Sequence, residues 1–365
     1  MAKTPKIRFK NFNDEWVENK LEYYLDISNK KNSNGIFDKN DVLSVSGEYG
    51  VVNQIKFKGR SFAGASTLNY NIADKNDVIY TKSPLNSTPF GIIKTNKDKI
   101  GIVSVLYAVY NAKDNVYPNF IQDYFNQDER LNNYLRPLVS KGAKNSMNIS
   151  NDTAISGNVL IPNLAEQCKI SEFFAKLDKL ITLHQSKFEK LQKIKKSCLQ
   201  NLFPQNNQNT PKIRFKNFTD EWAENKFSDI AQTRRGLTYK PLDIRINGIR
   251  VLRSSNINED KFIFDNTDVF VTKKAINIDY VKNGDILITS ANGSSHLVGK
   301  HAIIKNLPNK SAVHGGFMLL VTANNTEFLN ASMSSAWYQK FISLFVSGGN
   351  GAIGNLSQND LNNAY

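Results

Sequence analysis

The chain repeats its own opening segment, and this repeat restricts the possible folds more than any other feature. Residues 4–21, TPKIRFKNFNDEWVENKL, return as residues 210–227, TPKIRFKNFTDEWAENKF, with 15 of 18 positions identical. Weaker matches follow at an offset of 206 to 208 residues: DVIYT at Asp77 matches DILIT at Asp285, VSKG at Val139 matches VSGG at Val346, and MNIS ending at Ser150 matches GNLS ending at Ser357. A repeat of this kind predicts one structural unit built twice.

Between these matches the two copies have diverged. Short β-branched and aromatic runs alternate with Gly, Asn and Ser turns, which predicts strands. Each copy then has one amphipathic helix, at about residues 119–139 and 331–346, closed by Gly142 or Gly348. The predicted fold class is α+β, with a fixed frame that presents two independently variable surfaces. This arrangement suits a reader of two different half-sites.

A long helix is predicted between the copies. Residues 165–203 contain neither Gly nor Pro, and apolar residues recur at the 3-and-4 spacing of a coiled-coil seam. At about 1.5 Å per residue the helix would be on the order of 58 Å long. The predicted helix-pairing residues are Ile170, Phe173, Leu177, Ile181, Phe188, Leu191 and Leu202. The sequence thus divides into a first domain at 1–160, a coiled-coil spacer helix at 161–205 and a second domain at 206–365.

The formal net charge of +14 is spread along the chain and points to surfaces that attract polyanions, with nucleic acid as the first partner to consider. No run of about 18 apolar residues exists, and the start lacks the apolar core of a signal peptide, so we expect a cytoplasmic protein without membrane contact. Cys168 and Cys198 are predicted to be reduced thiols.

Taken together, the motifs resemble the specificity subunits of Type I restriction-modification systems. The matching parts are the P-K-I-R-F…EW…K-L opening of each copy, the I-P-x-L-x-E-Q lead-in at residues 161–167, the long helix, and GDILITS at residues 284–290. The resemblance implies two target recognition domains, each reading one half of a bipartite, asymmetric site in double-stranded DNA. An antiparallel pair of long helices would hold these domains apart.

The resemblance also implies partners. Modification subunits would dock on the helices and methylate adenine with S-adenosylmethionine, and restriction subunits that use ATP and Mg would join them. The chain itself would be non-catalytic, with no cofactor and no metal site.

One departure from the family pattern concerns the second long helix. Its lead-in is expected just past Tyr365, where the sequence stops. Either the chain is a fragment or a truncated variant, or another molecule supplies the partner helix. In the second case we expect the chain to self-associate through its long helix or to rely on the modification subunit.

Candidate DNA-contacting residues lie in matching loops and in two Arg-rich segments. Glycines allow close backbone approach, small polar side chains supply donors, and Arg suits phosphates and guanine. The alternative is that these are ordinary surface loops and solvated cations. The candidates are Lys82, Ser83, Lys141, Lys144, Asn145, Ser146, Arg234, Arg235, Lys240, Arg253, Ser290, Asn292, Ser294, Ser295, His296 and Asn350.

Motifs for catalysis are weak. GSSHLVGKH at Gly293 has the wrong spacing for a phosphate loop. Asp14, Glu18 and Lys20 echo a metal-dependent nuclease, but the element is more simply a docking segment. The adenine methyltransferase tetrad N/D-P-P-Y/F is not in the sequence, and the four histidines are scattered. Two alternatives remain open, a stand-alone nuclease and a coiled-coil scaffold that binds only proteins.

Overall fold

A computed structural model describes residues 4–85, 87–141, 147–205, 208–346 and 354–365. Its contacts divide the chain into two units, Met1–Gln185 and Ser186–Tyr365. The division falls inside helix α5 (Leu164–Asn201), so each unit includes one part of this helix. None of the described helices has the length and apolar character needed to span a bilayer.

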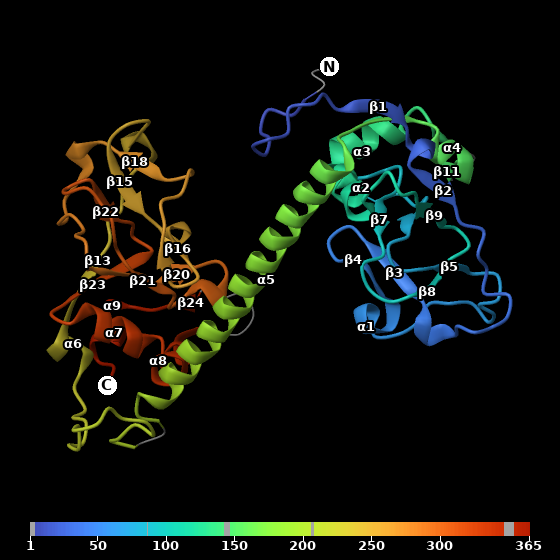
Figure 1. The fold of residues 1–365 in the computed structure, drawn as a ribbon. Coiled ribbons are helices and arrows are strands. Elements are labelled where there is room, and N and C mark those ends of the chain that lie inside the picture. Colours follow the sequence, from blue (N-terminus) through green and yellow to red (C-terminus); the bar gives the residue numbers. More distant parts are fainter. Residues whose placement is uncertain (1–3, 86, 142–146, 206–207, 347–353) are drawn as a thin grey trace. The chain divides into compact units, whose positions relative to one another are not determined.

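The first unit is built on an antiparallel sheet of four strands in the order β2-β9-β6-β7 (Figure 1). The inner strand β6 is buried on both faces of the sheet. Successive side chains of a strand point to opposite faces, so its three residues belong to two different clusters. Val78 and Tyr80 pack with α2, whereas Ile79 packs with strands β3, β4, β5 and β8. The bounds are β2 (Leu25–Ile27), β3 (Leu43–Ser46), β4 (Gly50–Asn53), α1 (Gln54–Lys58), β5 (Asn71–Ala73), β6 (Val78–Tyr80), β7 (Ile93–Thr95), β8 (Gly101–Val103), β9 (Ala108–Ala112) and α2 (Pro118–Phe125).

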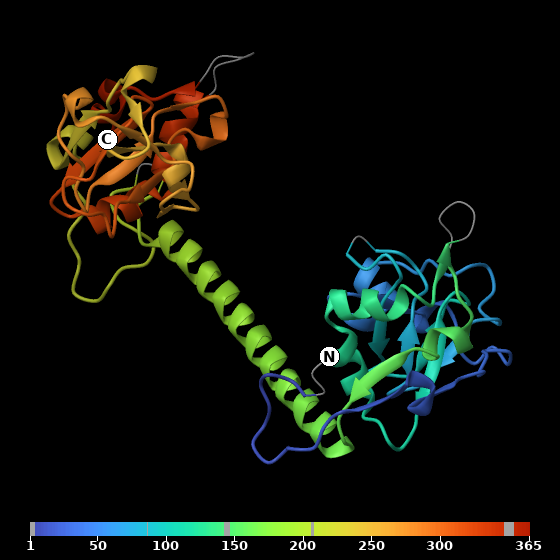
Figure 2. The same ribbon diagram turned by 90° about the horizontal axis from the view of Figure 1, so that it is seen from above.

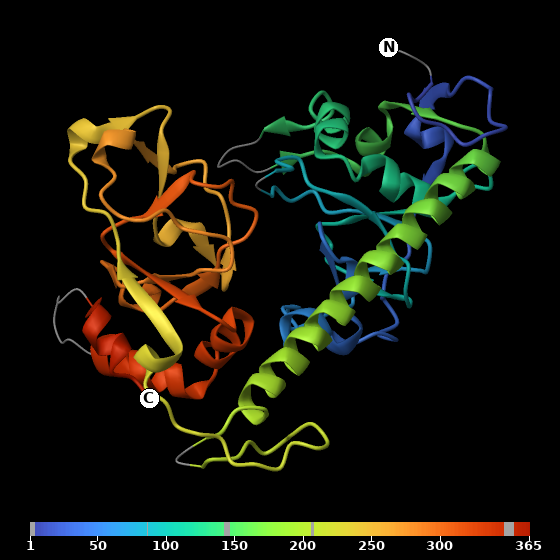
Figure 3. The ribbon, with the colours of Figure 1, turned by 90° about the vertical axis from the view of Figure 1, so that its left-hand side faces the viewer.

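The second unit repeats this sheet in the order β13-β23-β19-β21. Ile286 and Ile288 of β19 pack with helices α7 and α8, whereas Leu287 packs in a separate cluster on the opposite side. Both helices lie together at one end of this unit (Figure 3). A further sheet, in the order β14-β18-β15-β22, belongs to this unit alone. The bounds are β13 (Ala231–Arg235), β14 (Ile244–Arg245), β15 (Ile249–Leu252), β16 (Ile257–Asn258), β17 (Lys261–Phe262), β18 (Val269–Val271), β19 (Ile286–Thr289), β20 (Ala291–Asn292), β21 (His301–Ile303), β22 (Ala312–His314) and β23 (Met318–Ala323). The same strand order in both units confirms the predicted α+β repeat.

The helical part of each copy differs from the prediction of one amphipathic helix. The first unit has α2 and α3 (Asp128–Leu135), and the second has α7 (Thr326–Met333) and α8 (Ala336–Val346). Gln127 has extended backbone angles, which separates α2 from α3. Ser334 and Ser335 donate their hydroxyls to the carbonyls of Asn330 and Ser332, which competes with the helix ladder. The predicted closing residues, Gly142 and Gly348, lie outside the described residues.

The long helix α5 is confirmed and runs unbroken over 38 residues (Figure 2). Asn163 caps its first turn, because its side-chain oxygen accepts a hydrogen bond from the Glu166 amide at 3.0 Å. Five of the predicted seam residues are 38–56% exposed, namely Phe173, Leu177, Ile181, Phe188 and Leu191. The other two, Ile170 and Leu202, are partly buried.

In each copy of the repeat, the diverged segment between the matching ends, which we call the interior, begins and ends at neighbouring residues. In the first unit the Leu21 amide donates to the Gly157 carbonyl at 2.9 Å, beside the antiparallel pair β1 (Val17–Lys20) and β12 (Asn158–Ile161). In the second unit the Phe227 amide at the start of α6 (Phe227–Ile230) donates to the Ala364 carbonyl at 2.8 Å, just after α9 (Gln358–Asn362). The two hydrogen bonds lie at matching positions of the repeat.

Burial on both faces makes β6 a sensitive position. We expect Ile79→Ala to lower the free energy of unfolding by about 2 to 5 kcal/mol, because the side chain is fully buried and its removal leaves a cavity. The control Ile36→Ala, at a side chain that is 74% exposed, should change it by less than about 0.5 kcal/mol. Urea denaturation followed by circular dichroism measures both, and equal effects would contradict the packing of β6.

Candidate nucleic-acid interface

In the first unit, the predicted loop after β6 contacts the segment that follows the second predicted loop. Lys82, which follows β6, donates from its Nζ to Oδ1 of Asn151 at 2.6 Å. Asn151 begins α4 (Asn151–Ile155), whose N-cap is Ser150. The left-handed backbone of Lys82 (φ 47°) turns the chain toward this helix, and partial burial lowers the pKa of its amine. The neighbouring Ser83 hydroxyl donates to the Thr81 carbonyl.

The hairpin that leads to α4 carries the second loop. Its strands are β10 (Ser140–Lys141) and β11 (Met147–Asn148), and they pair antiparallel. Lys144, Asn145 and Ser146 lie outside the described residues, as does the side chain of Lys141. The strand after Lys141 therefore returns the chain to Ser150 and Asn151, beside Lys82. Sequence reasoning missed Asn151, although the repeat aligns the segment before it with GNLS in the second copy.

The second unit brings the matching loops together in a different way. Strand β20 pairs with β24 (Gly354–Asn355), and the Leu356 amide donates to the Ser290 carbonyl at 2.8 Å. Asn292 donates to the Ser254 hydroxyl at 3.0 Å, which attaches the Arg-rich segment 250–256 to the same loop. Asn350 lies outside the described residues.

The predicted residues in the loop after β19 differ in exposure. Ser295 and His296 are exposed, Asn292 and Ser294 are half-buried, and Ser290 is buried. The Ser294 hydroxyl lies 3.0 Å from Nδ1 of His296, so the two side chains interact locally. The exposed pair is therefore the part of this loop that is open to a ligand.

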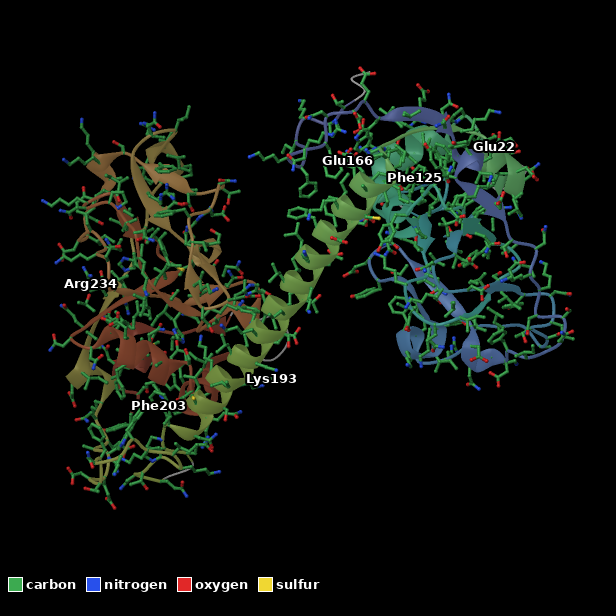
Figure 4. The ribbon with its side chains drawn as sticks, in the orientation of Figure 1. Glu22, Phe125, Glu166, Lys193, Phe203 and Arg234 are labelled. Carbon is green, nitrogen blue, oxygen red and sulfur yellow. The ribbon has the colours of Figure 1, made fainter. Side chains whose placement is uncertain are left out.

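The side chain of Arg234, labelled in Figure 4, is bound by partners within the second unit. Its Nη2 lies 3.2 Å from the Asp285 carboxylate and 3.2 Å from the Thr322 hydroxyl, and its side chain is 21% exposed. Asp285 is 3% exposed and also accepts from Thr322 at 2.6 Å. The backbone carbonyl of Arg234 lies 3.2 Å from Nε2 of His314, where burial lowers the pKa of the imidazole to about 4.

The other predicted cations of the second unit are less constrained. Arg235 and Lys240 are exposed, so their charges face solvent and are open to phosphate. Arg253 is half-buried, and its guanidinium donates to the Thr267 carbonyl at 2.5 Å. The Arg-rich segments therefore contain both structural and available cations.

The residues at the start of α5 form a structural site that binds this helix to the first unit. Glu166, at the start of α5 (Figure 4), is fully buried. Arg8 donates two hydrogen bonds to its carboxylate, with Nε–Oε1 at 2.8 Å and Nη2–Oε2 at 2.7 Å. Gln167 accepts from the Tyr117 amide at 2.8 Å and donates to the Pro162 carbonyl at 2.9 Å. Phe9 stacks edge-on against Phe173 of α5, with ring centroids 5.6 Å apart. The opening segment therefore docks on the first turns of the helix.

The residues that suggested a metal-dependent nuclease lie near the same opening segment. Glu18 and Lys20 lie on β1, where Glu18 accepts from Asn158 at 3.0 Å and Lys20 lies 3.3 Å from Glu22. Among the described residues, no group of three His, Cys, Asp or Glu side chains is placed to hold a metal ion. Glu18 and Lys20 thus belong to a strand that pairs with β12.

Comparison with known proteins identifies the fold through solved structures. No protein-family model matches the sequence, and no curated protein matches it. The S subunit of a Type I restriction-modification system from M. genitalium is 16% identical, with 99% of this chain and 86% of that chain covered and a TM-score of 0.55. The HsdS subunit from Thermoanaerobacter tengcongensis is 11% identical, with 100% and 86% covered and a TM-score of 0.44. A chain from a study of assembly of the type I R-M system is 11% identical, with 95% and 84% covered and a TM-score of 0.46.

The likeness to the M. genitalium structure shows that the chain has the fold of a Type I restriction-modification S subunit. This confirms the fold that the sequence resemblance implies. Within this fold, the present chain has two sheet-containing units and the long helix α5.

The contrast between Arg234 and its neighbours gives a test. Arg235→Gln with Lys240→Gln should flatten the dependence of log binding constant on log salt by up to about two units and leave stability nearly unchanged. Arg234→Gln should instead lower the free energy of unfolding by about 1 to 3 kcal/mol, because Asp285 loses a partner in a buried position. Salt titrations with duplex DNA and urea denaturation measure the two effects. An unchanged salt slope in the double variant would place this segment away from DNA.

Proposed function

We propose that the chain is the DNA sequence-specificity subunit of a Type I restriction-modification complex and carries no catalytic residues of its own. The observation that carries this proposal is the duplicated sheet, which keeps one strand order in both units while the attached loops and side sheets differ. A fixed frame with two different surfaces suits a bipartite, asymmetric DNA site, one half for each unit. The S-subunit fold supports the same assignment.

The partners follow from this role. Double-stranded DNA is the ligand, and modification and restriction subunits would supply methyl transfer and cleavage. We assign S-adenosylmethionine, ATP and Mg to those subunits. The half-exposed apolar side chains of α5 support a scaffold role, because such a stripe gains stability when another helix covers it.

Independent reading by the two units can be tested by exchange. Residues 22–150 are replaced by the corresponding residues of a relative, and the chimera is expressed with its modification subunit. One half of the methylated motif should change and the other half should stay, because the interior of the second unit is untouched. Sequencing that detects methylated adenine reads the motif directly.

The reciprocal exchange of residues 228–357 is the matched control and should change the other half. A change in both halves from either exchange, or in neither, would show that the units do not read independently. Cleavage of DNA by the purified chain alone would favour the nuclease alternative. Protein binding without site-dependent DNA binding would favour the scaffold alternative.

We further propose that α5 pairs antiparallel with α5 of a second copy when no other helix covers it. Six apolar side chains, Phe173, Leu177, Ile181, Phe188, Leu191 and Ile194, are 38–58% exposed. Covering the exposed half of each would contribute on the order of 5 to 9 kcal/mol, at about 1.5 to 3 kcal/mol for each fully buried side chain. An antiparallel arrangement would give a closed, two-fold symmetric pair.

Three substitutions test the pairing. Leu177→Asp, Phe188→Asp and Leu191→Asp together should give monomers that no longer support methylation, because each places a charge in the pairing surface. The control is Lys187→Asp, Lys190→Asp and Lys193→Asp, at exposed positions of the same helix. Analytical ultracentrifugation at micromolar concentration measures the association. A monodisperse monomer of the unsubstituted chain would contradict the proposal.

A further inference from the structure

A basic and aromatic surface of the first unit remains outside the loops considered so far. It is formed by the β3–β4 hairpin, α1 and the segment that follows, and we call it the α1 face. Residues 49–73 contain no Asp or Glu and carry Lys56, Lys58 and Arg60. All three cations are exposed. The stretch is therefore one of uncompensated positive charge within a folded unit.

Aromatic rings lie between these cations. The Lys58 amine lies 4.4 Å from the ring centroid of Phe57, and the Arg60 guanidinium carbon lies 4.8 Å from that of Phe62. Tyr49 packs against Phe57 with centroids 5.4 Å apart. Tyr49 and Phe62 are 59% and 58% exposed. Exposed rings interleaved with cations are the arrangement that nucleic-acid-binding surfaces use, because the cations meet phosphates and the rings meet sugars or bases.

The α1 face is held in place by side-chain hydrogen bonds. Gln54 accepts from the Phe62 amide at 2.6 Å and donates to the Ser44 hydroxyl at 3.1 Å, so the segment after α1 is fastened to β3. Gly59 ends α1 in the left-handed conformation (φ 77°), which turns the chain so that Arg60 follows directly. The cations are therefore presented on an ordered surface rather than on a tail.

Nearby carboxylates neutralise little of this charge. Asp38 and Asp41 cap the short turn at residues 39–41, where they accept from the backbone amides of Asn40 and Asp38 at 2.7 and 3.0 Å. Glu48 interacts with the hydroxyl of Tyr49 and raises its pKa. Within the described part of the chain, none of these carboxylates forms an ion pair with Lys56, Lys58 or Arg60.

We infer that the α1 face is a DNA-contacting surface of the first unit, in addition to the loops around Lys82 and α4. The inference rests on the proposed function, which supplies duplex DNA as the polyanion. Lys56, Lys58 and Arg60 contact phosphates, and Tyr49 and Phe62 pack on the sugar and base edges between them. Within the first unit α1 lies at the end away from α4 and β11, so this contact is separate from theirs (Figures 1 and 3).

The charge part of the inference has a quantitative signature. Lys56→Gln, Lys58→Gln and Arg60→Gln together, in the full chain with its modification subunit, should flatten the salt dependence of binding to a duplex target by about two to three units of slope. The matched control is Lys75→Gln, Lys97→Gln and Lys99→Gln, which removes equal charge from exposed lysines beside Asp74 and Asp98 and should leave the slope unchanged. Arg60→Gln alone should flatten it by about one unit.

The aromatic part has a different signature. Tyr49→Ala with Phe62→Ala should weaken binding about tenfold or more while the salt slope stays the same, because ring contacts release no counterions. Thermal unfolding checks that each variant is folded, and Arg60→Gln serves if the triple variant is not.

The outcomes separate this inference from the proposed function. If the unsubstituted complex binds no DNA in a site-dependent way, the proposed function fails. If it does, and the triple variant and Arg60→Gln keep both its affinity and its slope, the α1 face is not a DNA contact. Loss of the modification subunit from the triple variant with DNA binding intact would also overturn the inference, because the face would then be a protein-docking surface.

Discussion

The ion pair between Arg8 and Glu166 is the interaction on which the arrangement of the first unit and its helix depends. Glu166 is fully buried, and a buried carboxylate is costly unless it is paired and hydrogen-bonded. The two parallel hydrogen bonds from Arg8 meet this requirement and fix the opening segment against the first turn of α5. Gln167 adds hydrogen bonds with the Tyr117 amide and the Pro162 carbonyl, so the first turns of α5 are fixed to the first unit.

The two copies keep the same strand order, but different side chains bind the buried aspartate before the central strand. Asp77 and Asp285 occupy matching positions before the central strand, yet Asp77 accepts from Asn111 at 2.7 Å, whereas Asp285 pairs with Arg234 and Thr322. Burial raises the pKa of Asp77, whose side chain lacks an arginine partner. The aromatic contact of Trp16 with Phe120 returns as that of Trp222 with Phe328. The same strand order in the two units therefore accommodates different polar networks around the central strand.

The sequence was sufficient for the repeat, the α+β class and α5, because near-identical segments and a long run without Gly or Pro are local signals. It was insufficient where the backbone angles of a single residue or a distant partner decide the structure. The first helix is interrupted at Gln127, whose backbone is extended, and the second at Ser334, whose hydroxyl donates to the Asn330 carbonyl. The pairing of Arg234 with Asp285 joins residues 51 positions apart. The proximity of Lys58 to the Phe57 ring and of Arg60 to the Phe62 ring on the α1 face is likewise a matter of side-chain geometry that the order of residues does not give. Phe174, Leu180 and Leu183 of α5 are also exposed, in addition to the predicted seam residues.

The hydrogen bonds from Leu21 to Gly157 and from Phe227 to Ala364 join the two ends of each interior. A polypeptide loop whose ends are fixed beside each other can change its length and content without moving the points where it is attached, and its closure costs little more when it grows. Each interior therefore behaves as an exchangeable cassette. Replacing the residues between these bonds leaves the helix and its docking contacts the same. Under the proposed function, each such exchange would change the DNA sequence that one unit reads.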